Sequence, residues 1–151
     1  MKNSTMQTLA LWILILAPYV FLFFQYDSMP EQMPMHYNIK GEPDSFGSKT
    51  YLWLIPCALP LFIYLLMLVI PKIDPKKKLQ YMGSKYRQFH FMLILFMSAL
   101  SIYIMHSGMQ GESKAVFIHS LLGLLFVGLG NYFQSIRPNY FIGLRTPWTL
   151  E

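Results

Sequence analysis

Charged residues and cysteine are both scarce in this 151-residue chain, and each shortage excludes a class of protein. Only 13% of the residues are charged, whereas soluble domains average about a quarter, so a soluble globular protein is not expected. The single cysteine, Cys57, forms no internal disulfide and excludes a Cys-rich zinc or redox framework. The sequence also lacks the HExxH, GxSxG, P-loop and dinucleotide-binding motifs, so it matches none of these enzyme classes.

Hydrophobic residues make up 54% of the chain and gather in four long runs. The runs are apolar on every side rather than amphipathic, which is typical of helices that lie in lipid. We therefore predict an all-α polytopic membrane protein, a bundle of four transmembrane helices with a short structured extracellular loop between the first two. One integral membrane domain, 1–151, is expected, with helices at about 8–26, 51–71, 88–106 and 115–134, an outer loop at 27–50, an inner loop at 72–87 and a tail at 135–151.

The first apolar run has an alternative interpretation as a cleaved signal peptide. However, its apolar stretch is longer than the core of a usual signal peptide. No small-x-small cleavage site follows it, because the sequence there reads Phe23-Phe24-Gln25-Tyr26-Asp27. We therefore expect this run to remain in the protein as a membrane helix.

Lysine and arginine are unevenly distributed between the segments that connect the four runs. If the amino terminus is cytoplasmic, nine of the 12 lie inside: Lys2, Lys72, Lys76, Lys77, Lys78, Lys85, Arg87, Arg137 and Arg145. The outer ones are Lys40, Lys49 and Lys114. This bias predicts a multi-pass protein of the cell membrane with both termini in the cytoplasm. The same residues explain the net charge of +5, so contact with membrane lipids is expected and direct nucleic-acid binding is not.

Prolines interrupt the first two predicted helices, at Pro18 and at the pair Pro56 and Pro60. Each removes a backbone donor and favours a kink. The kinks are interpreted either as bends that improve packing or as a cavity or gate lined by freed carbonyls. The second interpretation leaves open a small transporter or channel component, which with so few helices would act as a homo-oligomer.

The outer loop contains a polar segment, residues 33–49, that is predicted to be a compact structured unit. Alternation predicts a short strand with two faces, one carrying Met35, Tyr37 and Ile39, the other carrying His36, Asn38 and Lys40. Gly41 and Gly47 offer positions for positive φ, and Glu42-Pro43-Asp44 is typical of a turn.

From its residues alone, the tail is either an anchor at the membrane interface or a binding segment.

Both polar segments resemble known signatures. The loop resembles MPxHxNxxGxPDxxGxK, a signature of a small-membrane-protein family of unknown function, and it matches at Met33, Pro34, His36, Asn38, Gly41, Pro43, Asp44, Gly47 and Lys49. The tail resembles RPNYFIGxRTPWTL of the SdpI family, and it carries Arg137, Pro138, Asn139, Tyr140, Gly143, Arg145, Thr146, Pro147 and Trp148. The two segments commonly occur in this order in one chain, and together the resemblance covers nearly all of this sequence.

The resemblance to the SdpI family implies a membrane immunity protein that is not an enzyme and that protects its cell from a secreted antimicrobial peptide toxin. For some members it also implies signalling by sequestration of a transcriptional repressor. The toxin or its membrane target is then expected at the loop residues His36, Asn38, Gly41, Asp44 and Lys49, and the repressor or lipid at the tail motif. SdpI-like chains typically continue into two further helices, whereas this sequence ends at Glu151, so a function that needs those helices is not expected to transfer.

The histidines offer a different hypothesis. His36, His106 and His119 are all predicted near the outer surface, where Glu42, Asp44 and Glu112 also lie, and such side chains are ligands for zinc. A site of this kind with an open position would serve a metal-dependent membrane hydrolase. No close-spaced histidine pair supports it, so no cofactor is expected, and His119 is interpreted instead as bonding to a neighbouring helix. His90 is expected among headgroups at the inner surface.

Overall fold

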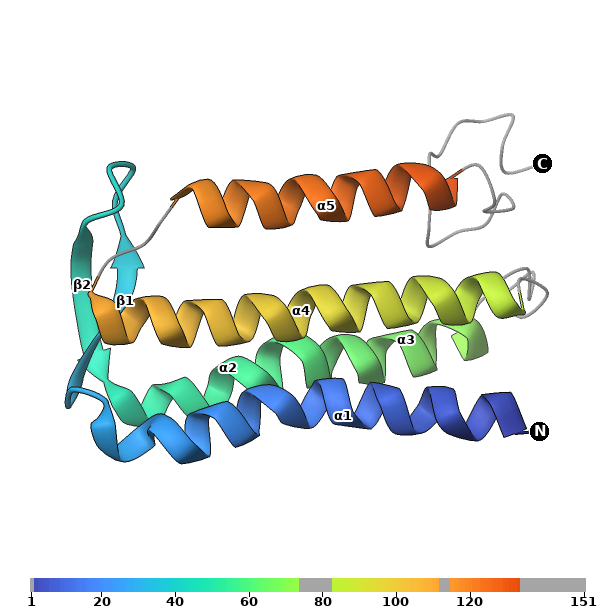
Figure 1. Cartoon of the computed structure of the whole chain (residues 1–151), viewed down its shortest axis with the longest axis horizontal. Helices are drawn as coiled ribbons and strands as arrows, with labels where there is room; N and C mark the ends of the chain where they lie inside the picture. Colours follow the sequence, from blue (N-terminus) through green and yellow to red (C-terminus); the bar gives the residue numbers. More distant parts are fainter. Residues whose placement is uncertain (1, 74–82, 112–114, 134–151) are drawn as a thin grey trace.

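Four helical stretches lie side by side and a two-stranded hairpin covers one end of them (Figure 1). The computed structural model describes residues 2–73, 83–111 and 115–133. The elements in chain order are α1 (Lys2–Gln25), η1 (Tyr26–Ser28), β1 (Gln32–Tyr37), β2 (Pro43–Ser48), η2 (Lys49–Trp53), α2 (Leu54–Pro56), η3 (Cys57–Leu61), α3 (Phe62–Ile73), α4 (Ser84–Gln110) and α5 (Ala115–Phe133). The predicted fold class is confirmed, and the structured loop is an antiparallel sheet. The end of the bundle that carries β1 and β2 is the hairpin end.

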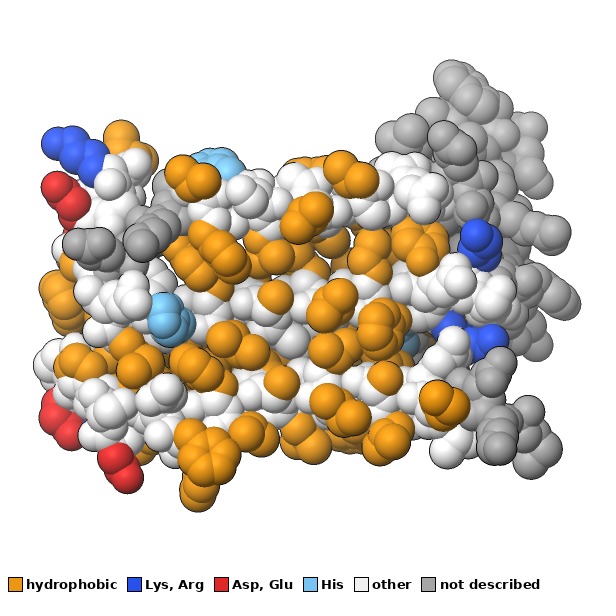
Figure 2. All heavy atoms as spheres, viewed as in Figure 1, with side chains coloured by type: hydrophobic (Ala, Val, Ile, Leu, Met, Phe, Trp, Pro, Cys, Tyr) orange, Lys and Arg blue, Asp and Glu red, His pale blue; other side chains and the backbone are white. Residues whose placement is uncertain are grey.

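Three helical stretches within the described residues are long and apolar enough to cross a membrane: Thr5–Ser28, Lys49–Ile73 and Ser84–Gln110. A fourth, shorter apolar stretch, Val116–Tyr132, lies in α5 alongside α4, which agrees with the fourth predicted helix. Hydrophobic side chains cover the middle of the bundle, and charged side chains lie near its two ends (Figure 2). The chain is therefore a multi-pass membrane protein.

Helix α4 is the centre of the bundle, because it packs against α1, α3, η3 and α5. It starts at Ser84, earlier than the predicted residue 88, so His90 lies inside the helix rather than at its beginning. The expectation that His90 sits among headgroups is wrong: the residue is only 6% exposed. Its ring stacks on Tyr64 of α3, with ring centres 5.4 Å apart.

The second helical stretch changes its geometry at its prolines. Cys57–Leu61 forms a π-helical turn that contains Pro60, between the short α2 and the longer α3. Prolines are a common cause of irregular geometry within a helix, and the pair four residues apart predicted an irregularity at this place. Pro18, Pro56 and Pro60 are all fully buried, as the packing interpretation of the kinks requires.

The most buried hydrophobic cluster lies at the hairpin end. It joins residues from five parts of the chain: Leu22, Met29, Met33, Leu52 and Met105. Unbranched methionine side chains fill irregular space well, which suits a junction between a sheet and three helical stretches. The hairpin is therefore part of the packed structure rather than a loop that hangs from it.

Candidate functional site

The two strands of the hairpin pair with an irregular register. Met33 lies opposite Gly47 and Pro34 opposite Phe46, after which the register skips Met35 in β1 and Asp44 in β2. The two skipped residues act as bulges, one in each strand. Because of them, the Nδ1 atom of His36 comes within 2.6 Å of the Oδ1 atom of Asp44. Two predicted site residues that are eight positions apart thus form one exposed pair.

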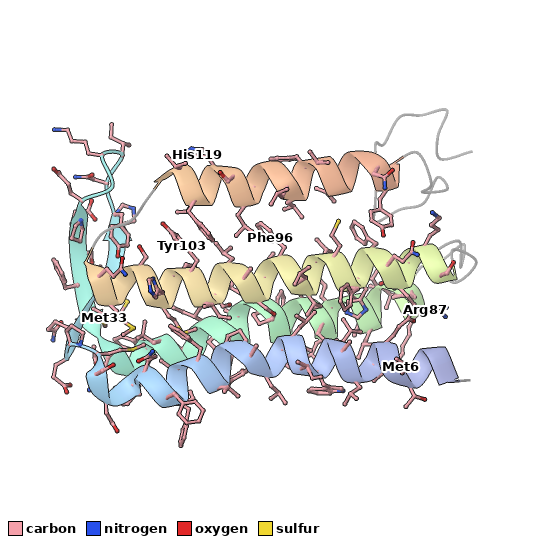
Figure 3. The ribbon with its side chains drawn as sticks, in the orientation of Figure 1. Met6, Met33, Arg87, Phe96, Tyr103 and His119 are labelled. Atoms are coloured by element: carbon pink, nitrogen blue, oxygen red, sulfur yellow. The ribbon has the colours of Figure 1, made fainter. Side chains whose placement is uncertain are left out.

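Because of the bulges, the side chains on each face of the strand differ from those predicted. Met33 is completely buried at the junction with the helices, where Figure 3 labels it. Met35 is 39% exposed, and Ile39 is fully exposed in the turn beyond the end of β1. An extra residue shifts a period-two pattern by one position, so the alternation that was counted from Met35 through Ile39 fails.

Asn38 and Gly41, two further predicted site residues, build the turn of the hairpin. The Oδ1 atom of Asn38 accepts hydrogen bonds from the backbone amides of Lys40 (2.8 Å) and Glu42 (3.1 Å). Its Nδ2 group donates to the Glu42 carboxylate at 3.1 Å. Gly41 has a φ of 82°, which glycine adopts without strain. Both residues shape the surface that the hairpin presents.

Lys49, the last predicted loop residue, ties the base of the hairpin to η1 and to the segment before β1. Its Nζ atom lies 2.9 Å from the Glu31 carboxylate and 4.8 Å from the centre of the Tyr26 ring. The lysine side chain is 13% exposed and that of Glu31 is 83% exposed. Glu31 rather than Lys49 is therefore the exposed member of this pair. Sequence reasoning missed Glu31, because Glu31 and Lys49 lie on opposite sides of the hairpin in the sequence and leave no local spacing signal.

A cavity of about 550 Å³ lies beside the hairpin, between α4 and α5. Its lining includes Tyr103, His106, Ser107 and Phe117, and the Tyr103 and Phe117 rings stack with their centres 4.4 Å apart (Figure 3). Tyr37 of β1 adjoins this group. Burial raises the pKa of Tyr37, and the Ser107 hydroxyl offsets part of that rise, so the Tyr37 hydroxyl stays protonated.

The structure does not bring the predicted zinc ligands together. His36 is paired with Asp44, and the Nε2 atom of His106 lies 3.5 Å from the Nε2 atom of Gln110 in its own helix. His119 is exposed on α5. Among residues 2–73, 83–111 and 115–133, no three His, Cys, Asp or Glu side chains gather as a metal site requires. The zinc hypothesis is therefore not supported by the described residues, and Glu112 lies outside them.

The tail motif also lies outside the described residues. It comprises Arg137, Pro138, Asn139, Tyr140, Gly143, Arg145, Thr146, Pro147 and Trp148. The hairpin and the adjoining cavity are accordingly the candidate site that the structure describes.

Two comparisons relate this arrangement to known proteins. Residues 13–59, from α1 through the hairpin into η3, match the Domain of unknown function DUF1648. Over 128 residues the chain is 27% identical to the immunity protein SdpI of Bacillus subtilis (strain 168), an alignment that covers 83% of this chain and 59% of that protein. The chain thus spans less than two thirds of the length of this relative. No solved structure matches the chain.

Proposed function

We propose that this chain, a multi-pass membrane protein of the SdpI-type family, makes its cell immune to a secreted, membrane-active peptide. The observation that carries the proposal is the 27% identity, over 83% of the chain, to a protein named for immunity. The same similarity supports protection by binding rather than by catalysis. The relative is the longer protein, so the proposal concerns the part that the two share.

We propose further that the hairpin end faces the outside of the cell. Every Asp and Glu among the described residues belongs to this end: Asp27, Glu31, Glu42 and Asp44. Lys72, Lys85 and Arg87 belong to the opposite end, beside the segment that carries Lys76, Lys77 and Lys78 in the sequence. Basic residues near membrane helices favour the cytoplasmic side, which supports this orientation.

The hairpin end has the chemistry to bind a cationic amphipathic peptide. The Glu31, Glu42 and Asp44 carboxylates are exposed on it, and so are the apolar side chains of Ile39 and Phe46. Membrane-active peptides commonly carry Lys and Arg on one face and apolar residues on the other. Such a peptide would place its basic face on the carboxylates and its apolar face on Phe46 and the cavity between α4 and α5. Binding there would keep the peptide from entering the bilayer.

A second role at the opposite end is proposed from the sequence alone. The tail motif resembles that of the SdpI family, some of whose members sequester a transcriptional repressor. We propose that Arg137, Asn139, Arg145 and Trp148 contact lipid or such a repressor in the cytoplasm.

The test of immunity is survival. A sensitive host that expresses the full chain is challenged with the peptide fraction secreted by the organism that encodes it. We expect survival to rise with the chain and to fall again in the His36→Ala and Asp44→Ala variants, whose side chains are exposed. Lys85→Gln, at the opposite end, is the matched control and should protect fully. Equal killing with and without a membrane-inserted chain contradicts the proposal.

A further inference from the structure

A second cavity, of about 620 Å³, lies at the end of the bundle opposite the hairpin. It is formed between three helices, with Gln7 and Thr8 contributed by α1, Arg87 and His90 by α4, and Tyr132 by α5. Tyr132 is positioned by an edge-to-face contact with Phe89, with ring centres 6.0 Å apart. The volume is within the usual range for sites that bind a small amphiphile. None of these residues belongs to the hairpin site.

The lining changes from polar to apolar along the helices. On α4, Arg87 and Gln88 come first, and Phe91 and Leu95 follow deeper in the bundle. Arg87 and Leu95 are eight residues apart, which is about 12 Å along a helix. On α1, which runs in the same direction as α4 in Figure 1, the polar Gln7 and Thr8 precede Leu11 in the same way. The cavity therefore has a polar mouth toward the end of the bundle opposite the hairpin and an apolar interior, the same order as in a phospholipid.

Two features of the lining favour a ligand with charged or polar atoms: Arg87 at the mouth and the buried His90 within the cavity. The exposed Arg87 guanidinium presents a planar set of donors that suits a phosphate group. Only 6% of the surface of His90 is exposed. Within the described residues its Nε2 atom has no hydrogen-bond partner. A buried polar atom without a partner costs free energy, and a polar ligand atom in the cavity would recover that cost.

Charge favours an anionic occupant for this cavity. Arg87 lies in the lining, and no Asp or Glu of the described residues does. The described Asp and Glu side chains all belong to the hairpin end. Positive charge at the end of a membrane helix attracts anionic lipid headgroups, so charge complementarity favours an anionic lipid.

We propose that this cavity binds one anionic phospholipid, with its phosphate group at Arg87 and an acyl chain along Phe91 and Leu95. The bound lipid bridges α1, α4 and α5 and fastens the shorter α5 to the rest of the bundle. This site is independent of the proposed immunity, because it lies at the other end of the bundle and shares no residue with the hairpin.

Native mass spectrometry of the full chain released from detergent micelles tests the site. The titrants are phosphatidylglycerol, phosphatidylcholine with the same acyl chains, and glycerol phosphate, which is the headgroup alone. We expect one phosphatidylglycerol to bind about tenfold more tightly than phosphatidylcholine, and Arg87→Gln to remove about that factor. Lys85→Gln, which removes an exposed charge two residues away that does not line the cavity, should change the affinity less than twofold.

Several results would overturn the site. These are equal affinities for the two lipids, unchanged binding in Arg87→Gln, or equal losses in Arg87→Gln and Lys85→Gln. Displacement of the lipid by glycerol phosphate alone would show a site for a free phosphate compound instead. Leu95→Trp provides a second variant that fills the apolar part: it should weaken phosphatidylglycerol binding while the helical content stays unchanged, and undiminished binding contradicts the proposal.

Discussion

Ser98 of α4 donates a hydrogen bond to the backbone carbonyl of Leu14 in α1, with the Oγ and O atoms 2.8 Å apart. Leu14 lies four residues before Pro18, which has no amide hydrogen to offer that carbonyl. The hydroxyl of the neighbouring helix therefore replaces the bond that the proline removes. Within lipid no water is present to take its place, so this bond couples α1 to α4 at the proline.

This relationship predicts an energetic coupling. Ser98→Ala should destabilise the bundle by about 0.6–1.7 kcal/mol, the range for hydrogen bonds between membrane helices. Pro18→Ala returns an amide donor to Leu14, so Ser98→Ala should cost less in that background. Denaturant unfolding of the four proteins in detergent measures the coupling. The same cost in both backgrounds would show that the bond and the proline are unrelated.

A second hydroxyl of α4 acts in the same way on α3. The Tyr86 hydroxyl donates to the carbonyl of Met67, at 2.5 Å, and Met67 lies four residues before Pro71. Tyr86→Phe keeps the ring and should cost about 1 kcal/mol, because it leaves that carbonyl without its donor. Tyr64→Phe is the matched control: it keeps the stacking on His90 and should cost much less. Equal costs for the two variants in the same unfolding experiment would contradict the assignment.

Met33 is predicted to hold the hairpin on the bundle. Met33→Ala removes a fully buried side chain from the cluster at the hairpin end and should cost about 2–5 kcal/mol. Met35→Ala, at the exposed bulge two residues along β1, should cost far less. Limited proteolysis checks both, since cleavage within residues 32–48 should accelerate only in Met33→Ala. Comparable acceleration in both variants would mean that the hairpin is not anchored at Met33.

Asn38 is predicted to stabilise the turn through its side-chain oxygen. Asn38→Ala loses the acceptor for the amides of Lys40 and Glu42, so hydrogen exchange at these two amides should accelerate. Asn38→Asp keeps an acceptor at this position and should accelerate exchange less, although it places a second carboxylate near Glu42. Unchanged exchange in Asn38→Ala would contradict this role.

Sequence patterns predicted the helices well and the hairpin only in part. Long apolar runs identify membrane helices directly, because lipid requires an apolar surface along the whole span. They do not identify the first turn of α4: Ser84 to Arg87 is polar and was assigned to the inner loop, which misplaced His90. The strand was recognised, but its bulges were not, because alternation along one strand contains no information about the partner's register.

For the candidate site, too, the sequence predicted the residues but not their contacts. The sequence singled out His36, Asn38, Gly41 and Asp44, and the structure gathers all of them in the hairpin. His36 pairs with Asp44 across the two strands, whereas Asn38 organises the turn through local hydrogen bonds. The cavity between α4 and α5 was not predicted. It depends on which faces of the two helices pack together, and sequences that are apolar on every side do not indicate those faces.

The proposed function requires the hairpin end to lie outside the cell, and site-specific labelling tests this orientation directly. Cys57 is the only cysteine, so Cys57→Ala gives a background in which Ile39→Cys, in the exposed turn, and Lys85→Cys, at the opposite end, are introduced separately. A membrane-impermeant maleimide is applied to intact cells and to lysed cells. We expect the position-39 variant to be labelled in intact cells and the position-85 variant only after lysis. Labelling of position 85 but not position 39 in intact cells would contradict the central claim.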